Sequence, residues 1–191
     1  MSEATPARSV VSWGRIARRI RVPLGFLFAV FYCWRARPDW LSLGMGGAVA
    51  VAGVFLRAMA SGHVKKNEQL ATTGPYAYCR NPLYLGSIII AVGFAIASRD
   101  VWVAIGIIAL FSAIYVPVIR GEETFLRGQF SEYDSYARRV PRLLPNTAWF
   151  PGLTAGFSRE LYRQHREYNA LIGAAALLAA LVVKMLWFAG S

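Results

Sequence analysis

Residues 74–86 read GPYAYCRNPLYLG, a stretch in which a turn-forming, aromatic and basic loop runs directly into a long apolar segment. Asn81 suits the cap of a helix, and Pro82 suits its first position because the ring fixes φ and no N–H is needed there. A helix should therefore begin at this point, with its free N–H groups facing the loop. Such a helix end is able to bind a carboxylate or phosphate, although the same pattern also describes a well-capped helix without a ligand.

The composition of the whole chain indicates a membrane protein. Of its 191 residues, 56% are hydrophobic and the mean hydropathy is +0.40, which is too apolar for an ordinary soluble domain. The formal net charge is +11, but the basic residues stand between apolar segments, so they indicate orientation in a membrane rather than nucleic-acid binding. Cys33 and Cys79 are predicted to face opposite sides of the membrane, and no disulfide is expected.

The apolar runs predict an all-α, polytopic integral membrane protein with about five transmembrane helices. The predicted spans are residues 22–34, 40–60, 82–98, 101–119 and 168–189. Lys and Arg concentrate in the N-terminal segment, in loop 61–80 and in segment 120–167, which predicts a cytosolic N-terminus. Residues 120–139 carry apolar side chains at helical spacing among charges. They predict an amphipathic helix that continues the fourth span and lies along the cytosolic surface.

Individual residues within the spans carry further predictions. Gly46, Ala50 and Gly53 form a stripe of small residues that permits close helix packing, more readily against another span of this chain than against a second copy. Arg57 lies about a turn from the inner end of the second span, where it either reaches the headgroups or points into a polar site. Lys184, near the outer end of the last span, is expected to extend to the headgroups.

A second stretch, residues 122–145, adds a further motif, because Glu122 and Glu123 are followed by aromatic residues and then by Val140 and Pro141. The two stretches, separated by one hydrophobic hairpin, resemble the core of the isoprenylcysteine carboxyl methyltransferases and the related phospholipid methyltransferases. That core reads G-x-Y-x-x-x-R-H-P-x-Y-x-G and then E-E-x-x-L, and the resemblance covers about residues 60–145. Asn81 stands where the family usually has His, which argues against a proton-transfer role at this position.

The resemblance implies methyl transfer from S-adenosylmethionine to a lipidic acceptor that enters from the bilayer. The implied cofactor contacts are Glu68, Gln69, Leu70, Ala71, Tyr76, Asn81, Pro82, Leu83, Tyr84 and Glu122. Arg120 and Glu122 are the implied catalytic residues, and Arg120 would orient the substrate. Arg57 is a second substrate-binding candidate, on the separate ground that it is a charge within a predicted span. Ordinary explanations compete with these roles: Arg138, Arg139 and Arg142 suit headgroup binding, and acidic residues are favourable in the first turn of a helix.

The residues leave the acceptor class open. The carboxylate of an isoprenylcysteine-like substrate needs no general base at neutral pH and is favoured for that reason, whereas an amine such as that of phosphatidylethanolamine needs one. A sterol-reductase-like NADPH enzyme ranks lower, because the chain lacks the additional helices of those proteins, and so does a non-enzymatic scaffold. No metal site is predicted, since His63 and His165 are isolated and the cysteines lack ligand spacing.

The chain is expected to form one membrane domain. Residues 1–60 would hold two N-terminal spans, residues 61–145 the methyltransferase-like core with its helical hairpin, and residues 146–191 a linker and the last span. Because the third and fourth spans form one hairpin, Asn81 and Glu122 are expected at the same, cytosolic face. The membrane would be the cytoplasmic (inner) membrane in a prokaryote and the endoplasmic reticulum in a eukaryote, and the expected partners are lipids and not nucleic acid.

Overall fold

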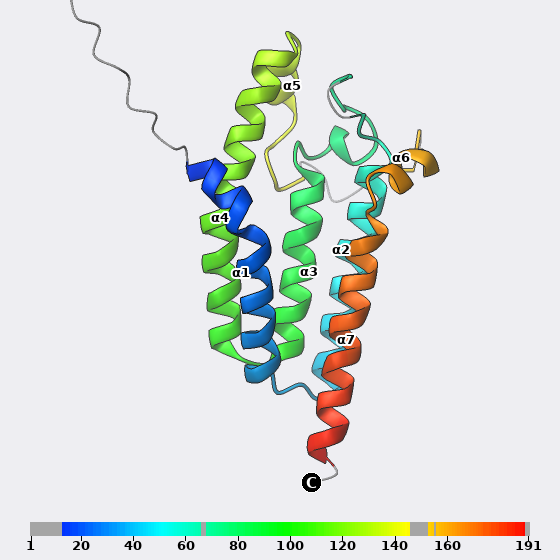
Figure 1. Ribbon diagram of the computed structural model, residues 1–191. Helices are drawn as coiled ribbons and strands as arrows, with labels where there is room; N and C mark the ends of the chain where they lie inside the picture. The colour runs from blue at the N-terminus through cyan, green and yellow to red at the C-terminus, as the bar shows by residue number, and fades with distance from the viewer. Residues whose placement is uncertain (1–12, 66–67, 146–152, 155, 190–191) are drawn as a thin grey trace, which may run out of the picture.

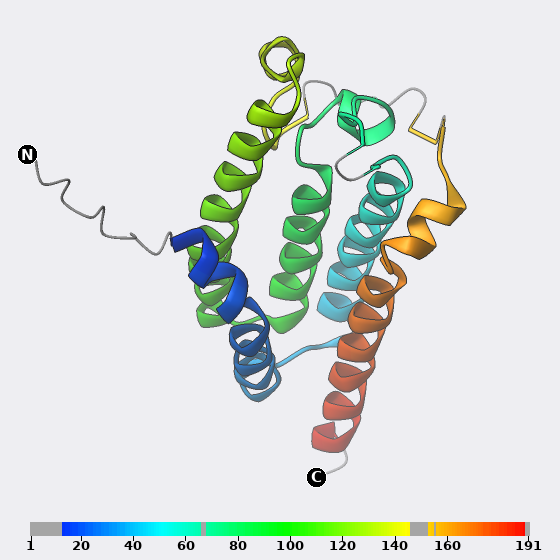
Figure 2. The same ribbon diagram turned by 45° about the horizontal axis from the view of Figure 1, so that its top comes forward.

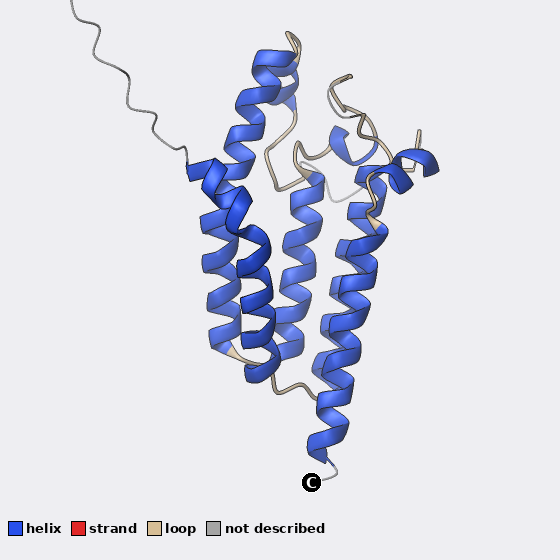
Figure 3. Cartoon of the chain, viewed as in Figure 1, coloured by secondary structure: helices blue, strands red, loops and turns tan. Residues whose placement is uncertain are grey.

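The computed structural model describes residues 13–65, 68–145, 153–154 and 156–189, and in these residues the secondary structure is helical without any strand (Figure 3). The all-α prediction is therefore confirmed. A short 3₁₀ helix, η1 (Gly74–Ala77), precedes the third of the long helices. The α-helices are α1 (Trp13–Arg35), α2 (Trp40–Ser61), α3 (Pro82–Ser98), α4 (Val101–Gln129), α5 (Tyr133–Arg139), α6 (Arg159–Gln164) and α7 (Tyr168–Ala189).

A helix lies at each of the five predicted spans. Among the described residues, three helical segments are long and apolar enough to cross a membrane: Trp40–Ser61, Val101–Gln129 and Tyr168–Trp187. Leu24–Arg35, within α1, and Pro82–Ser98 are shorter apolar segments. Large apolar side chains such as Phe26, Leu41 and Ile172 remain exposed along the helices, as expected for a surface that faces lipid instead of water. The orientation of the helices across the membrane stays a prediction.

The close packing of α2 against α3 organises the bundle. Figures 1 and 2 show α3 between α2 and α4, with α7 beside α2 and α1 beside α4. The small residues on α2 face small residues on α3, so that a Cβ atom on Gly53 would lie only 2.6 Å from the carbonyl oxygen of Gly86. Gly46 and Gly93 approach each other in the same way. The predicted packing of the small-residue stripe within the chain is therefore confirmed.

At one end of the bundle, charged and polar side chains form contacts around the short connections 36–39 and 99–100, and we call this the hairpin end. Asp100 caps α4 and forms an ion pair with Arg35 at 2.6 Å. Lys184 Nζ donates to the carbonyl oxygens of Cys33 and Ala36, both at 2.6 Å, so it caps the C-terminal end of α1. The expectation that Lys184 extends to the headgroups was wrong, because these carbonyls lie within its reach.

The predicted amphipathic helix 120–139 does not form as one piece. Its first half continues α4 to Gln129, as expected, and α4 runs through Pro117 without a break in the helix. The backbone of Phe130 is extended, and α5 then turns back, so that Tyr133 and Tyr136 pack with Leu126 and are almost fully buried. Burial of these two rings favours the reversal over a continuous surface helix. Figure 1 shows α5 at the opposite end of the bundle from the hairpin end.

Candidate functional site

The loop before α3 folds tightly under the end of α2. Gly74 has a φ of +57°, and the ring of His63 occupies the space where a side chain at residue 74 would lie. Only glycine satisfies both conditions at low cost. The turn directs the following η1 helix inward and buries Tyr76, so the loop reaches the start of α3 with aromatic and basic side chains turned into the protein.

Asn81 and Pro82 begin α3 at the predicted position, but the Asn81 side chain does not cap the helix. It is buried, and its Nδ2 donates instead to Glu123 Oε1 at 3.2 Å and to the carbonyl oxygen of Arg142 at 3.0 Å. The Nδ2 donor therefore has two acceptors outside α3, and the side chain makes no capping hydrogen bond to the first turn of α3. The start of α3 is thereby joined to α4 and to the segment after α5.

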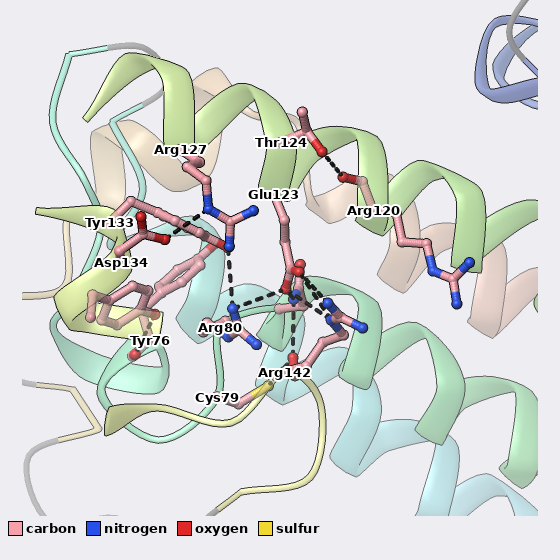
Figure 4. Close-up of polar contacts among 12 residues, drawn as sticks. Tyr76, Cys79, Arg80, Arg120, Glu123, Thr124, Arg127, Tyr133, Asp134 and Arg142 are labelled. Atoms are coloured by element: carbon pink, nitrogen blue, oxygen red, sulfur yellow. Dashed lines mark hydrogen bonds and ion pairs between the residues drawn. The ribbon is translucent and has the colours of Figure 1, made fainter. Parts of the chain in front are cut away.

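Glu123 is the centre of this polar cluster (Figure 4). Its carboxylate is almost fully buried and accepts from Arg142 Nε at 3.0 Å and from Arg142 Nη2 at 2.7 Å. Arg80 Nη1 lies 3.5 Å from the same carboxylate and 3.4 Å from the hydroxyl of Tyr133. The hydrogen bond to Glu123 raises the pKa of Arg142 above its ordinary value. The cluster thus holds two cations against one buried anion.

A cavity of about 790 Å³ lies between the loop before α3, the first turn of α3 and the last turns of α4. Its size is within the range of small-molecule sites. Glu122 and Tyr84 lie on its wall, and the hydroxyl of Tyr84 donates to Glu122 Oε2 at 2.8 Å. The prediction that one hairpin brings the two motifs together is therefore confirmed by two contacts between α3 and α4, one from Tyr84 and one from Asn81.

Aromatic side chains close the part of the cavity nearest the loop. Tyr76, Tyr133 and Tyr136 line it, and the hydroxyl of Tyr136 donates to the carbonyl oxygen of Tyr76 at 2.8 Å. Burial raises the pKa of Tyr76 and of Tyr136 above the ordinary value, so both hydroxyls stay protonated at neutral pH. These rings can pack against a planar or apolar part of a ligand, and neither hydroxyl can act as a general base.

Most of the predicted cofactor contacts line this one cavity. Glu68 and Pro82 are the exceptions: Glu68 is exposed, and Pro82 is buried in the first turn of α3, and neither is part of the cavity wall. The predicted contacts that line the cavity are Gln69, Leu70, Ala71, Tyr76, Asn81, Leu83, Tyr84 and Glu122. Their gathering gives the predicted ligand contacts one physical location, and their roles stay predictions.

The two arginines predicted for the substrate lie elsewhere. Arg120 is exposed, is not part of the cavity wall, and projects away from Glu123 in Figure 4. Arg57 forms a bidentate ion pair with Glu167 at 2.7 Å and donates to the carbonyl oxygen of Leu83 at 3.2 Å. Of the two environments considered for Arg57, a polar one is found, but it joins α2 to the segment before α7 and to α3.

The sequence reasoning missed two residues that build the site. Arg142 was expected at the headgroups, whereas it pairs with Glu123 because the segment after α5 returns to the cavity. Arg80 was assigned no role, yet its side chain lines the cavity, is only 12% exposed, and has an Nε atom without a hydrogen-bond partner. The position of Arg80 directly before Asn81-Pro82 was the available signal, since a charge next to a buried helix start needs a partner.

The cavity therefore has a cationic side and an acidic side. Arg80 supplies the buried positive charge, and Glu122 with Tyr84 supplies acceptors and a hydroxyl for hydroxyl or ammonium groups. Such an arrangement suits a ligand that carries an anionic group at one end and hydroxyl groups at the other. Within the described ranges, no three His, Cys, Asp or Glu side chains gather to hold a metal ion, and the predicted lack of a metal stays a prediction.

Comparison with protein families identifies one match. The model of a family described as phospholipid methyltransferase matches residues 40–133, from the start of α2 to the start of α5. The match thus includes both helices of the hairpin and all of the predicted cofactor contacts. No solved structure matches the chain.

Two curated relatives are similar over a comparable length. The nickel-cobalt-cadmium resistance protein NccN of Alcaligenes xylosoxydans xylosoxydans is 35% identical over 127 residues, which are 65% of this chain and 56% of the relative. The cobalt-zinc-cadmium resistance protein CzcN of Cupriavidus metallidurans is 36% identical over 117 residues, which are 60% of this chain and 53% of the relative. The chain thus matches about half the length of each relative.

Proposed function

Residues 40–133 of this chain belong to the phospholipid methyltransferase family of integral-membrane methyltransferases, and on this premise we propose that the protein transfers a methyl group from S-adenosylmethionine to a lipidic acceptor. The observation that carries the proposal is the cavity itself. It brings Gln69 and Tyr76 of the loop, Tyr84 of α3 and Glu122 of α4 to one wall, although they come from three separate parts of the matched region.

The residues of the cavity fit this cofactor chemically. Glu122 and the hydroxyl of Tyr84 can hold the ribose hydroxyls, and the rings of Tyr76 and Tyr136 offer a face for the adenine. The unpartnered Nε of Arg80 is a donor for the carboxylate of the amino-acid end. The cofactor supplies a methyl group on a sulfonium ion, which is already a strong electrophile. The protein's task is to align the acceptor with it and to exclude water.

For the acceptor we propose a carboxylate of the isoprenylcysteine type. Among the carboxylates and phenols of the cavity, Glu123 is bound by Arg142, and Tyr76 and Tyr136 are held neutral by burial. A carboxylate acceptor needs no general base, so it suits such a site. Phosphatidylethanolamine is the second candidate, because the family model is that of phospholipid methyltransferases and because Glu122 can pair with an ammonium group.

The location of the site belongs to the same proposal. The cavity is lined by the loop before α3 and the last turns of α4, which lie at the end of the bundle opposite the hairpin end (Figure 1). That loop and the end of α5 carry Lys and Arg, so we place the cavity at the cytosolic face, in the cytoplasmic (inner) membrane if the source is a prokaryote. The acceptor would enter sideways from the bilayer, with its head group in the cavity and its chain along the exposed apolar surfaces of the helices.

Calorimetry on the detergent-purified protein tests the proposal. S-adenosylhomocysteine is titrated into the wild type, Glu122→Ala and Tyr76→Ala, with NADPH as the competing ligand class and Glu132→Ala, an exposed carboxylate outside the cavity, as the matched control. We expect S-adenosylhomocysteine to bind the wild type and the control with micromolar affinity and to lose that affinity in both cavity variants. NADPH is expected not to bind. Absence of binding to a well-folded wild type contradicts the proposal, and binding of NADPH alone indicates a reductase.

A transfer assay then separates the acceptors. Labelled S-adenosylmethionine is supplied with either a farnesylcysteine analogue or vesicles that contain phosphatidylethanolamine, and the labelled product is extracted. Carboxyl methyl esters release methanol in base, whereas N-methyl groups do not. Base-labile label on the cysteine analogue supports the carboxylate acceptor, and base-stable label in the phospholipid assigns the amine instead.

A further inference from the structure

The segment after α5, residues 140–145, returns to the start of α3 and is held there by backbone and side-chain contacts; we call it the strap (Figure 1). The backbone N–H of Arg80 donates to the carbonyl oxygen of Pro141 at 2.9 Å, and Cys79 Sγ donates to that of Arg142 at 3.6 Å. Val140, the first residue of the strap, is buried with the rings of α5. The strap itself does not line the cavity, so it lies behind the cavity wall.

Asn81 connects the strap to the wall. Its Nδ2 atom carries two hydrogens, and each has an acceptor: Glu123 Oε1 at 3.2 Å and the Arg142 carbonyl at 3.0 Å. Asn81 is 7% exposed, so neither acceptor can easily be replaced by water. One amide nitrogen thus holds a residue of α4 and a residue of the strap at the same time.

This contact affects the charge of the cavity through Arg142. While the strap is in place, Arg142 binds both oxygens of Glu123, and Arg80 is left with a 3.5 Å approach to the same carboxylate. If the strap moves away, Glu123 loses its bidentate partner and Arg80 is the remaining cation near it. Arg80 would then be drawn to Glu123 and would no longer present its free donor to a ligand.

We propose that Asn81 is a positioning residue that keeps the strap closed, and so keeps Arg80 available for the anionic group of the ligand. Asn81 transfers no proton in this role. The inference rests on the proposed function for the identity of the ligand, S-adenosylmethionine with its carboxylate, but the closure of the strap by Asn81 is a separate statement about the fold.

Two substitutions test the amide, because each keeps a polar side chain and removes a donor. Asn81→Asp turns both contacts into acceptor–acceptor contacts, and the neutral imidazole of Asn81→His offers one N–H for two acceptors. Asn169→Asp and Asn169→His, at an exposed asparagine near the start of α7, are the matched controls. Circular dichroism and elution as a single species confirm that each variant is folded before it is used.

The first measurement follows the strap directly. Trypsin cleaves after Arg142 and after Arg139, which is exposed at the end of α5, and mass spectrometry gives the ratio of the two products. We expect Asn81→Asp to raise the ratio of cleavage after Arg142 to cleavage after Arg139 about tenfold, and Asn81→His to raise it less. The reason is that a lost hydrogen bond to a charged group is typically equivalent to a factor of about ten or more. An unchanged ratio in both variants overturns the closure of the strap by Asn81.

The second measurement asks whether the strap acts through Arg80. S-adenosylhomocysteine and 5′-methylthioadenosine, which lacks the amino-acid end, are titrated into each variant. We expect Asn81→Asp to weaken S-adenosylhomocysteine about tenfold and methylthioadenosine less than about twofold, since only the first carries the carboxylate. Equal weakening of both ligands shows a general structural loss and overturns the role through Arg80. If the wild type binds neither ligand, the proposed function fails, and the trypsin ratio still decides whether Asn81 closes the strap.

Discussion

The two faces of α3 are built on opposite principles. Towards α2 the helix presents glycines, and a Cβ on Gly93 would lie 2.5 Å from the carbonyl oxygen of Gly46, so the two backbones are nearly in contact. Towards α4 it presents Tyr84, which meets the ring of Tyr115 edge-on at 5.4 Å between ring centres. On the α2 face there is no room for a side chain at the glycine positions, whereas the α4 face carries large rings and borders the cavity.

This difference separates the face of α3 that stabilises the bundle from the face that borders the proposed ligand site. In lipid, apolar burial gives little drive for helix association, so close backbone packing between small residues must hold α2 and α3 together. The space between α3 and α4 can then hold polar groups from neighbouring elements, such as Glu122 of α4 and Arg80 of the loop before α3, whose Nε has no partner within the protein. Substitutions on the two faces should therefore change different measured quantities.

The largest effect is expected on the face towards α2. Gly53→Leu would place a side chain 2.6 Å from the Gly86 carbonyl oxygen and 2.7 Å from the Ile90 nitrogen, both backbone atoms that cannot turn aside. We expect the free energy of unfolding to fall by about 3 kcal/mol or more. Gly44→Leu, on the same helix with no atom within 4 Å, is the control and should change it little. Thermal unfolding in detergent measures both, and equal losses contradict the close packing.

A smaller loss of stability is expected from Glu123→Ala at the cavity. The substitution removes the ion-pair partner of Arg142 and of the buried Arg80, and it leaves Asn81 with only the Arg142 carbonyl as an acceptor. Because the Arg142 side chain is 50% exposed and can turn to water, we expect a loss of about 2 kcal/mol rather than the larger value of a fully buried pair. Glu132→Ala serves as the exposed control in urea unfolding, and a loss no greater than that of the control contradicts the structural role of Glu123.

Substitutions at Glu122 and Tyr84 are expected to weaken ligand binding and to leave the stability of the protein almost unchanged. Their hydrogen bond is exposed, so Glu122→Gln and Tyr84→Phe should each alter the free energy of unfolding by less than about 0.5 kcal/mol. Each should weaken S-adenosylhomocysteine about five- to tenfold, because a hydrogen bond to the ligand is lost or weakened. If the two side chains act as a unit, the fold-loss of affinity in the double variant should be smaller than the product of the two single fold-losses. A fold-loss equal to that product, or no loss of affinity at all, contradicts a shared ligand contact.

The fold could be predicted from the sequence to the extent that it depends on local signals. Apolar runs predicted the positions of the long helices, Asn81-Pro82 marked the start of α3, and the small residues of α2 predicted a close partner. The reversal after Gln129 could not be predicted in this way. Helical spacing continues from α4 into α5, and only the burial of Tyr133 and Tyr136 against the loop before α3 decides that the chain turns back.

The candidate site was predictable where motifs carried it and not where tertiary pairing did. The two motifs led to Tyr84 and Glu122, which do lie together on the cavity wall. The partners of charged residues were not predictable, because they depend on segments far apart in sequence. Arg57 pairs with Glu167 because the segment before α7 packs beside α2, and Arg142 pairs with Glu123 because the segment after α5 returns to α4. From the sequence alone, headgroup binding explained both arginines equally well.

The smallest perturbation comes from chemical modification of Cys79, because this thiol is native to the loop before α3. Cys79 is 1% exposed, and burial raises the pKa of its thiol to about 11. In Cys33→Ser protein, alkylation of Cys79 by iodoacetamide should therefore rise about tenfold per pH unit from pH 8 to 10, whereas in the unfolded chain the rate should level off above about pH 9. The raised pKa also means that the neutral thiol stabilises the fold below about pH 8.5, a contribution lost as the pH rises towards 11. If the alkylation rate of the folded protein levels off near pH 9, the thiol of Cys79 is open to water, which contradicts the burial of the loop before α3.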